Sequence, residues 1–199
     1  GGIYGGFFTA TEGAGMGAMG AFLFALARRA LNWKALFEVL VESARTTAML
    51  FTLLIAATIF ANFVNLAGFT GSISDWLLGL QISPMGIVIA ICILYLIMGC
   101  IFDSLSMLIL TIPIFAAILK PLGVDMIWFG IVAVITVEMG LITPPVGLNV
   151  FVVKATIGDI SLGTAFKGVW PFVVAMMLGL ALILIFPQIA TFLPGLMGR

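Results

Sequence analysis

The sequence predicts an all-α polytopic membrane protein, and three observations carry this prediction. First, 63% of the 199 residues are hydrophobic and only 8% are charged, whereas about 25% of the residues in a soluble domain are charged. Second, apolar runs of roughly 20 residues, enough to cross about 30 Å of hydrocarbon, recur with short polar gaps between them. Third, two consecutive prolines interrupt one such run. We therefore expect several membrane helices, one of them discontinuous.

Charge and residue content narrow the function. The eight basic and eight acidic residues cancel, so no electrostatic footprint for nucleic acid is expected. The chain has no histidine, which removes the commonest general base and zinc ligand and argues against a Ser-His hydrolase or a zinc-dependent membrane protease. We interpret Cys92 and Cys100 as buried thiols rather than metal ligands or a disulfide. We expect a transporter, a channel or a scaffold, and not an enzyme.

Residues 1–67 are predicted to form scaffold helices. The T-x-x-E pattern from Thr9 to Glu12 predicts a capping box at the start of a helix that runs to about Arg29. Glu12 is either this cap or a functional intramembrane carboxylate. At about 32–45, apolar residues recur at helical spacing among charged ones, which predicts an interfacial arm helix lying along the membrane surface.

A full span from about Thr46 to Leu66 follows the arm helix, and residues 68–83 form a lightly polar periplasmic link without a basic residue. Residues 84–121 contain two apolar helices, each slightly short for a crossing, joined by a turn from Gly99 to Ser106 that has no Lys or Arg. We expect this segment to be a re-entrant hairpin whose tip is buried near mid-membrane.

Residues 126–158 form the predicted discontinuous transmembrane helix. A proline lacks an amide donor and pushes the preceding residue out of the helical region, so Thr143-Pro144-Pro145 should end the first half. Gly147 gives the freed backbone room to turn, and Leu148 resumes the helix. Residues 161–199 are predicted to hold an interfacial stretch, 161–167, and a last span at about 169–189.

The basic residues near helix ends predict the orientation. Six of them fall on one side, which should be the cytoplasm: Arg28, Arg29, Lys34, Arg45, Lys154 and Lys167. Lys120 and Arg199 lie opposite. A hairpin and two complete crossings preserve the same parity, so the charges do not distinguish them.

A helix broken inside a bilayer exposes peptide groups that cost several kcal/mol each unless something binds them. The carbonyl end of a half-helix suits Na⁺, and the amide end of the next half suits a carboxylate. We predict a Na⁺ site at Gly99, Asp103, Thr143 and Gly147. We predict a substrate site at Ser104, Ser106, Pro145, Val146 and Asn149. An alternative is that Asp103 merely caps the helix that follows it. The sequence assigns no role to Glu138.

Four motifs resemble one known family. GGIYGGFFTATEGAG, MGCIFDSLSMLILTIPIF, GVDMIWFGIV and EMGLITPPVGLNVFVV look like the C-terminal half of the large permease subunit of TRAP transporters, the tripartite ATP-independent periplasmic (DctM-type) permeases. The resemblance covers nearly the whole chain. Ala10 departs from the family's F-T-x-T-E motif, in which proline commonly follows the first threonine.

The resemblance implies a Na⁺-driven secondary transporter of the bacterial inner membrane that imports organic acids such as C4-dicarboxylates or sialic acid. A periplasmic binding protein would deliver the solute, and a small membrane subunit would accompany the large one. It also implies an ion-transporter-like elevator fold with two inverted repeats, of which this chain holds the second. The N-terminal half of the same permease would supply the first repeat, and this polypeptide alone should not transport.

The sequence is also compatible with other classes of membrane protein. A single-component Na⁺/carboxylate transporter of similar fold would need no binding protein. A channel or structural membrane subunit is a further alternative, although no ring of like charges or repeated filter sequence is visible. An intramembrane aspartyl protease would need a second catalytic aspartate beside Asp103.

Overall fold

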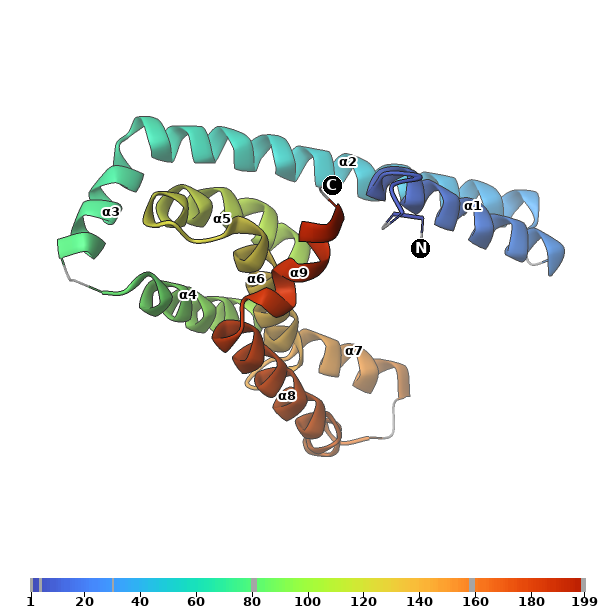
Figure 1. Ribbon diagram of the computed structural model, residues 1–199. Coiled ribbons are helices and arrows are strands. Elements are labelled where there is room, and N and C mark those ends of the chain that lie inside the picture. Colours follow the sequence, from blue (N-terminus) through green and yellow to red (C-terminus); the bar gives the residue numbers. More distant parts are fainter. Residues whose placement is uncertain (1, 4, 30, 80–81, 158–159, 198–199) are drawn as a thin grey trace. The chain divides into compact units, whose positions relative to one another are not determined.

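The computed structural model (Figure 1) describes residues 2–3, 5–29, 31–79, 82–157 and 160–197. All regular secondary structure within these residues is helical. The chain divides into two compact units, residues 1–51 with 192–199 and residues 52–191. The predicted hairpin and the predicted helix break both lie in the second unit.

Four helices in the described part of the chain are long and apolar enough to cross a membrane: Ala10–Ala27, Trp33–Val64, Ser104–Leu122 and Leu162–Ile185. They agree with the prediction of an all-α polytopic membrane protein. One of them, Ser104–Leu122, has 19 residues and belongs to the hairpin. The second hairpin helix itself, Ser104–Leu119, has 16 residues, as expected, and reaches the length of a span only together with the 3₁₀ turn Lys120–Leu122. Length alone does not distinguish a re-entrant hairpin from two crossings.

In the first unit, α1 (Ala10–Ala27) begins with a complete capping box. The amide of Thr9 donates to Glu12 Oε2 at 2.7 Å, and the amide of Glu12 donates to Thr9 Oγ1 at 3.3 Å. Two amides at the helix start thereby gain acceptors, as the T-x-x-E pattern predicts. Glu12 was interpreted either as a helix cap or as a functional intramembrane carboxylate, and in the structure it forms the cap.

Helix α2 (Trp33–Leu66) is one uninterrupted helix that includes both the predicted arm, 32–45, and the predicted span from Thr46 to Leu66. Asn32 caps it by accepting the amide of Ala35 at 2.7 Å. The two segments differ in charge, which predicts different surroundings, but neither contains a glycine or proline that would break the backbone hydrogen bonds. The expected division at about residue 45 is thus absent from the backbone.

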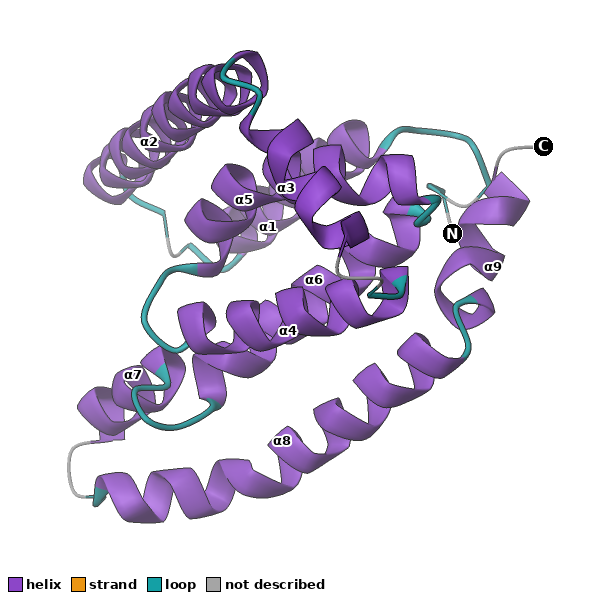
Figure 2. Ribbon diagram, turned by 90° about the vertical axis from the view of Figure 1, so that its left-hand side faces the viewer, coloured by secondary structure: helices purple, strands orange, loops and turns teal. Residues whose placement is uncertain are grey.

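The second unit contains the end of α2, α3 (Phe69–Gly79), α4 (Pro84–Gly99), α5 (Ser104–Leu119), the short 3₁₀ helix η1 (Lys120–Leu122), α6 (Met126–Ile142), α7 (Leu148–Ile157), α8 (Leu162–Ile185) and the start of α9 (Gln188–Met197). Helix α6 is central, because it contacts α4, α5, α7 and α8. Figure 2 shows α4 lying along α6. The candidate site is built around this pair.

The core of the second unit consists of side chains from α4 and α6 together with residues of α5 and α8. Its most deeply buried members include Val88, Tyr95, Phe129, Val132 and Val137, each at most 1% exposed. In a water-soluble protein, burying a side chain of this size away from water stabilises the fold by about 1.5–3 kcal/mol. Between membrane helices the corresponding gain comes from close packing. This packing fixes α4 against α6.

The predicted link at 68–83 contains a helix, α3, which sequence reasoning missed. Gly68 ends the preceding helix with φ 71°, a left-handed conformation that glycine adopts readily. Phe69 and Ile73, four residues apart, line a cavity with residues of α4 and α5. This segment was predicted to be a link because its composition is lightly polar, but one face of α3 is apolar and packs beside α5.

Helix α8 joins the predicted interfacial stretch, 161–167, to the last span and ends at Ile185, earlier than the predicted residue 189. Ser161 caps it by accepting the amide of Thr164 at 3.1 Å. The early end follows from Pro187, which moves Phe186 out of helical geometry, with φ −121° and ψ 78°.

Pro187 also leaves a carbonyl of α8 without its usual partner. The oxygen of Ile183 would normally accept from the amide of residue 187, which proline lacks. The indole Nε1 of Trp128, on α6, donates to this oxygen at 2.9 Å. One side chain therefore satisfies the carbonyl and fastens α6 to α8.

We expect Trp128→Phe to destabilise the protein by about 1–3 kcal/mol, because it leaves the Ile183 carbonyl without a donor. Thermal unfolding in detergent measures this effect. Trp170→Phe on α8 is the matched control, because Trp170 is exposed and its loss should change the melting temperature little. Equal melting temperatures for the two variants would contradict the role assigned to the indole.

Candidate functional site

The helix break lies where the double proline predicts it. Helix α6 ends at Ile142, Thr143 has extended backbone with φ −94° and ψ 140°, and α7 begins at Leu148. The Pro144–Pro145 peptide bond is cis. Gly147 closes the turn, and its carbonyl accepts the amides of Val150 at 2.8 Å and Phe151 at 3.3 Å, which starts the second helix.

Gly147 is required by conformation and by space. Its φ is 61°, in the left-handed region that residues with a side chain rarely adopt. A Cβ atom added there would lie 3.0 Å from the ring of Phe166 and 3.2 Å from the carbonyl oxygen of Thr143. The turn brings backbone so close to backbone that glycine alone fits.

Thr143 satisfies part of the exposed end of α6. Its hydroxyl donates to the carbonyl of Met139 at 2.5 Å, and its amide donates to the carbonyl of Gly140 at 3.1 Å. The next carbonyls along the chain, those of Thr143 and Pro144, point toward the thiol of Cys100 on the hairpin.

Cys100 brings the hairpin turn to the break. Its sulfur lies 3.2 Å from the carbonyl oxygen of Leu96, 3.5 Å from that of Thr143 and 3.7 Å from that of Pro144. A thiol has one proton and is a weak donor. Three carbonyl oxygens thus converge on a group that can donate to only one of them at a time.

Gly99 and Gly140 let the two backbones touch beside this cluster of carbonyls. A Cβ atom on Gly140 would lie 2.8 Å from the Cα of Gly99 and 3.0 Å from the carbonyl oxygen of Leu96. A Cβ atom on Gly99 would lie 2.9 Å from the carbonyl oxygen of Val137. The facing atoms belong to the backbone and cannot turn aside, so glycine is needed on both sides.

Asp103 caps α5 at the far side of the hairpin turn. The amide and the hydroxyl of Ser106 both donate to Asp103 Oδ2 at 3.0 Å. The capping interpretation left open by the sequence is therefore present in the structure. Oδ1 of Asp103, which is exposed, accepts no hydrogen bond from the described residues. One carboxylate oxygen is occupied by the cap and the other is available.

The two arms of the hairpin are tied by a buried polar pair. The hydroxyl of Thr111 donates to the carbonyl of Met107 at 2.7 Å, and the hydroxyl of Tyr95 lies 2.8 Å from that of Thr111. Tyr95 is therefore the donor of this pair. Its ring also meets Phe115 edge to face, with centroids 5.4 Å apart. These contacts hold α4 against α5 behind the turn.

The structure brings some predicted site residues together and leaves others apart. Gly99 lies against α6 near its end, and Thr143 and Gly147 form the break. Asp103, Ser104 and Ser106 make no hydrogen bond to the break within the described residues. Ser106 instead lines a largely apolar cavity of about 440 Å³ with residues of α2 and α4.

The remaining predicted substrate residues differ in exposure. Pro145 and Asn149 are exposed, and Val146 is half-buried. Among the described residues, no group of three or more Cys, Asp or Glu side chains gathers as a metal cluster. Sequence reasoning missed Cys100 as part of the site and treated it only as a buried thiol. Its position directly after Gly99, inside the predicted turn, was the available signal.

A protein-family model described as "Tripartite ATP-independent periplasmic transporter, DctM component" matches residues 1–189. The chain belongs to this family. The resemblance inferred from the four motifs is thereby confirmed.

Curated relatives of this DctM-family chain agree with the assignment. It is 32% identical over 98% of its length to a sialic acid TRAP transporter large permease protein of Vibrio cholerae. It is 34% identical over its full length to a C4-dicarboxylate TRAP transporter large permease protein of Pseudomonas aeruginosa, and 30% identical to an ectoine TRAP transporter large permease protein of Halomonas elongata. The chain covers 46–47% of these relatives, or about half of their length. They are transporter permease subunits, not enzymes.

Proposed function

We propose that this chain is part of the large permease subunit of a Na⁺-coupled TRAP transporter, located in a bacterial inner membrane. It would import an organic acid, such as a C4-dicarboxylate or sialic acid, with a small membrane subunit and a periplasmic binding protein as partners. The re-entrant arrangement of residues 84–121 and an elevator movement are part of this proposal. The convergence of carbonyl oxygens between the hairpin turn and the break is the observation that carries it.

Na⁺ prefers hard oxygen ligands, and the residues at this contact can supply them. The single thiol proton of Cys100 cannot satisfy the carbonyls of both Thr143 and Pro144, so at least one of these oxygens lacks a donor there. The end of α6 adds the negative end of its helix dipole. We propose that carbonyl oxygens of the break and the hairpin turn, with Asp103 nearby as counter-charge, hold the ion.

The start of α7 offers the opposite polarity to a substrate. The amides of Val150 and Phe151 are bound to Gly147, whereas those of Leu148 and Asn149 have no hydrogen bond within the described residues. Free amides at a helix start bind carboxylates. We propose that they receive the substrate's acid group, with the exposed side chain of Asn149 beside them. When bound, Na⁺ would supply positive charge that offsets the charge of the acid.

Uptake of radiolabelled succinate and sialic acid into proteoliposomes tests the proposal. The vesicles contain the full-length permease with its small subunit, with or without an inward Na⁺ gradient and a candidate binding protein. We expect saturable uptake of an organic acid that needs both. Uptake without the binding protein would indicate a single-component carrier, and non-saturable flux without a gradient requirement would indicate a channel. Either result would overturn the proposal.

A further inference from the structure

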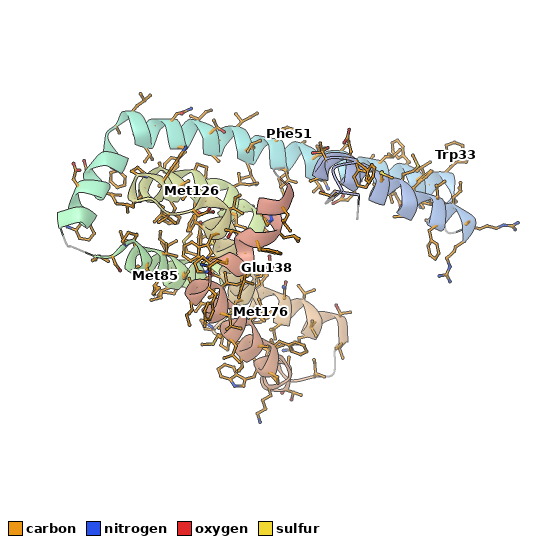
Figure 3. The ribbon with its side chains drawn as sticks, in the orientation of Figure 1. Trp33, Phe51, Met85, Met126, Glu138 and Met176 are labelled. Carbon is orange, nitrogen blue, oxygen red and sulfur yellow. The ribbon has the colours of Figure 1, made fainter. Side chains whose placement is uncertain are left out.

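Glu138 is an exposed carboxylate on the central helix of the second unit. It lies on α6 and is labelled in Figure 3. Its neighbours along the chain, Val137 and Met139, are both buried in the core. Glu138 therefore points out of the unit rather than into it, and the core offers it no partner.

The position of Glu138 along α6 places it at membrane depth. At about 1.5 Å per residue, it lies roughly 18 Å from the start of the helix at Met126 and about 7.5 Å before the break at Thr143. Both distances fall inside a hydrocarbon layer about 30 Å thick. A carboxylate left without a partner there costs about 3 kcal/mol or more.

No group among the described residues of the same unit compensates this charge. The basic residues of the unit, Lys120, Lys154 and Lys167, lie near helix ends, and none forms an ion pair with Glu138. The carboxylate also accepts no hydrogen bond from the described residues. The described residues of this unit therefore leave the charge of Glu138 uncompensated, and a partner is sought outside residues 52–191.

The surface around Glu138 indicates what supplies that group. Ile127 and Val134 precede Glu138 by eleven and four residues, which places them on the same helix face, and they are 53% and 45% exposed. A helix face in contact with water would carry several polar residues. The face formed by Ile127, Val134 and Glu138 is instead apolar except for one acidic group. Such a surface suits an apolar helix with one cation at matching depth.

We propose that the stripe of Ile127, Val134 and Glu138 docks a membrane helix from outside residues 52–191, and that this helix presents one Lys or Arg to Glu138. Helix α1 has no Lys or Arg between Ala10 and Ala27, so it does not supply the cation. The proposal concerns assembly and does not depend on which ion or acid the protein transports.

Photo-cross-linking locates the docked helix. Benzoylphenylalanine at Val134, one turn from Glu138, should join the stripe in the full-length permease to a peptide of a membrane helix outside residues 52–191 that contains Lys or Arg. The same probe at Ile93, a comparably exposed apolar position on α4, should not yield that peptide. Cross-links only to lipid, to a second copy of α6, or to a helix without a basic residue would overturn the proposal.

A charge exchange then tests the ion pair. Glu138→Lys should lower the melting temperature of the purified permease, and replacing the basic residue of the cross-linked helix by Glu should restore it. Val134→Lys adds a cation to the same face without removing the carboxylate, so the same partner exchange should not rescue it. Failure of the exchange to rescue Glu138→Lys, or equal rescue of both variants, would show that Glu138 has no specific cationic partner.

Discussion

Gly140→Ala should lower Na⁺-dependent uptake at subsaturating Na⁺ about tenfold or more. The added Cβ would lie 2.8 Å from the Cα of Gly99 and 3.0 Å from its carbonyl carbon. Neither atom can turn aside, so the hairpin turn must move away from the break. Overpacking of this kind costs about 1–3 kcal/mol, and 1.4 kcal/mol corresponds to about a tenfold change in an equilibrium constant. Uptake as a function of Na⁺ concentration measures the effect.

Gly130→Ala provides the matched control on the same helix. No atom lies within 4 Å of a Cβ built on Gly130, so the substitution adds helix propensity without a clash. It should retain the Na⁺ dependence of the wild type. Gly99→Ala should reproduce the effect of Gly140→Ala. The loss of Na⁺-dependent uptake in the double variant should be smaller than the sum of the two single losses, because both substitutions disrupt the same contact. Unchanged Na⁺ dependence in a normally folded Gly140→Ala protein would show that the contact does not position the ion site.

Asp103→Asn should raise the Na⁺ concentration for half-maximal uptake about tenfold or more while leaving the melting temperature nearly unchanged. Asparagine caps helices about as well as aspartate, so the bonds to Ser106 can persist. What is lost is the negative charge, and interactions with charged groups are worth about 1.5–3 kcal/mol. Comparing Na⁺ titrations of uptake with thermal unfolding separates the charge from the cap.

Asp125→Asn tests the same chemical change away from the candidate site. Asp125 caps α6 by accepting the amides of Ile127 and Trp128 at 2.8 and 2.9 Å. Its replacement should leave the Na⁺ requirement as in the wild type. If Asp103→Asn and Asp125→Asn behave alike in the Na⁺ titration, Asp103 is only a cap. If wild-type uptake itself needs no Na⁺, the proposed coupling fails before either variant is considered.

The local features of this chain were predictable because they depend on neighbours in sequence. Proline geometry predicted the end of α6 at Thr143, and side-chain capping predicted the start of α1 at Thr9. The continuity of α2 was missed because composition was used to divide a segment whose backbone has no breaker. The early end of α8 was predictable from Pro187, but the apolar run beyond it was given more weight.

The contacts that make the site were not predictable in the same way. That Gly99 faces Gly140 depends on how α4 and α6 lie against each other, which no local pattern specifies. The same holds for Cys100, whose sulfur meets carbonyls more than 40 residues away along the chain, with sequence separations of 43 and 44. Motif resemblance indicated the segments involved, while the pairing of atoms between them required the fold.

The touching backbones of Gly99 and Gly140 limit how this part of the protein can rearrange. Two helices separated by side chains can slide by exchanging rotamers, but helices in direct backbone contact must separate before they shift. Helices α4 and α6 should therefore travel as one rigid block through any working cycle. Displacement must then be taken up by the segments that connect this block to the rest of the chain.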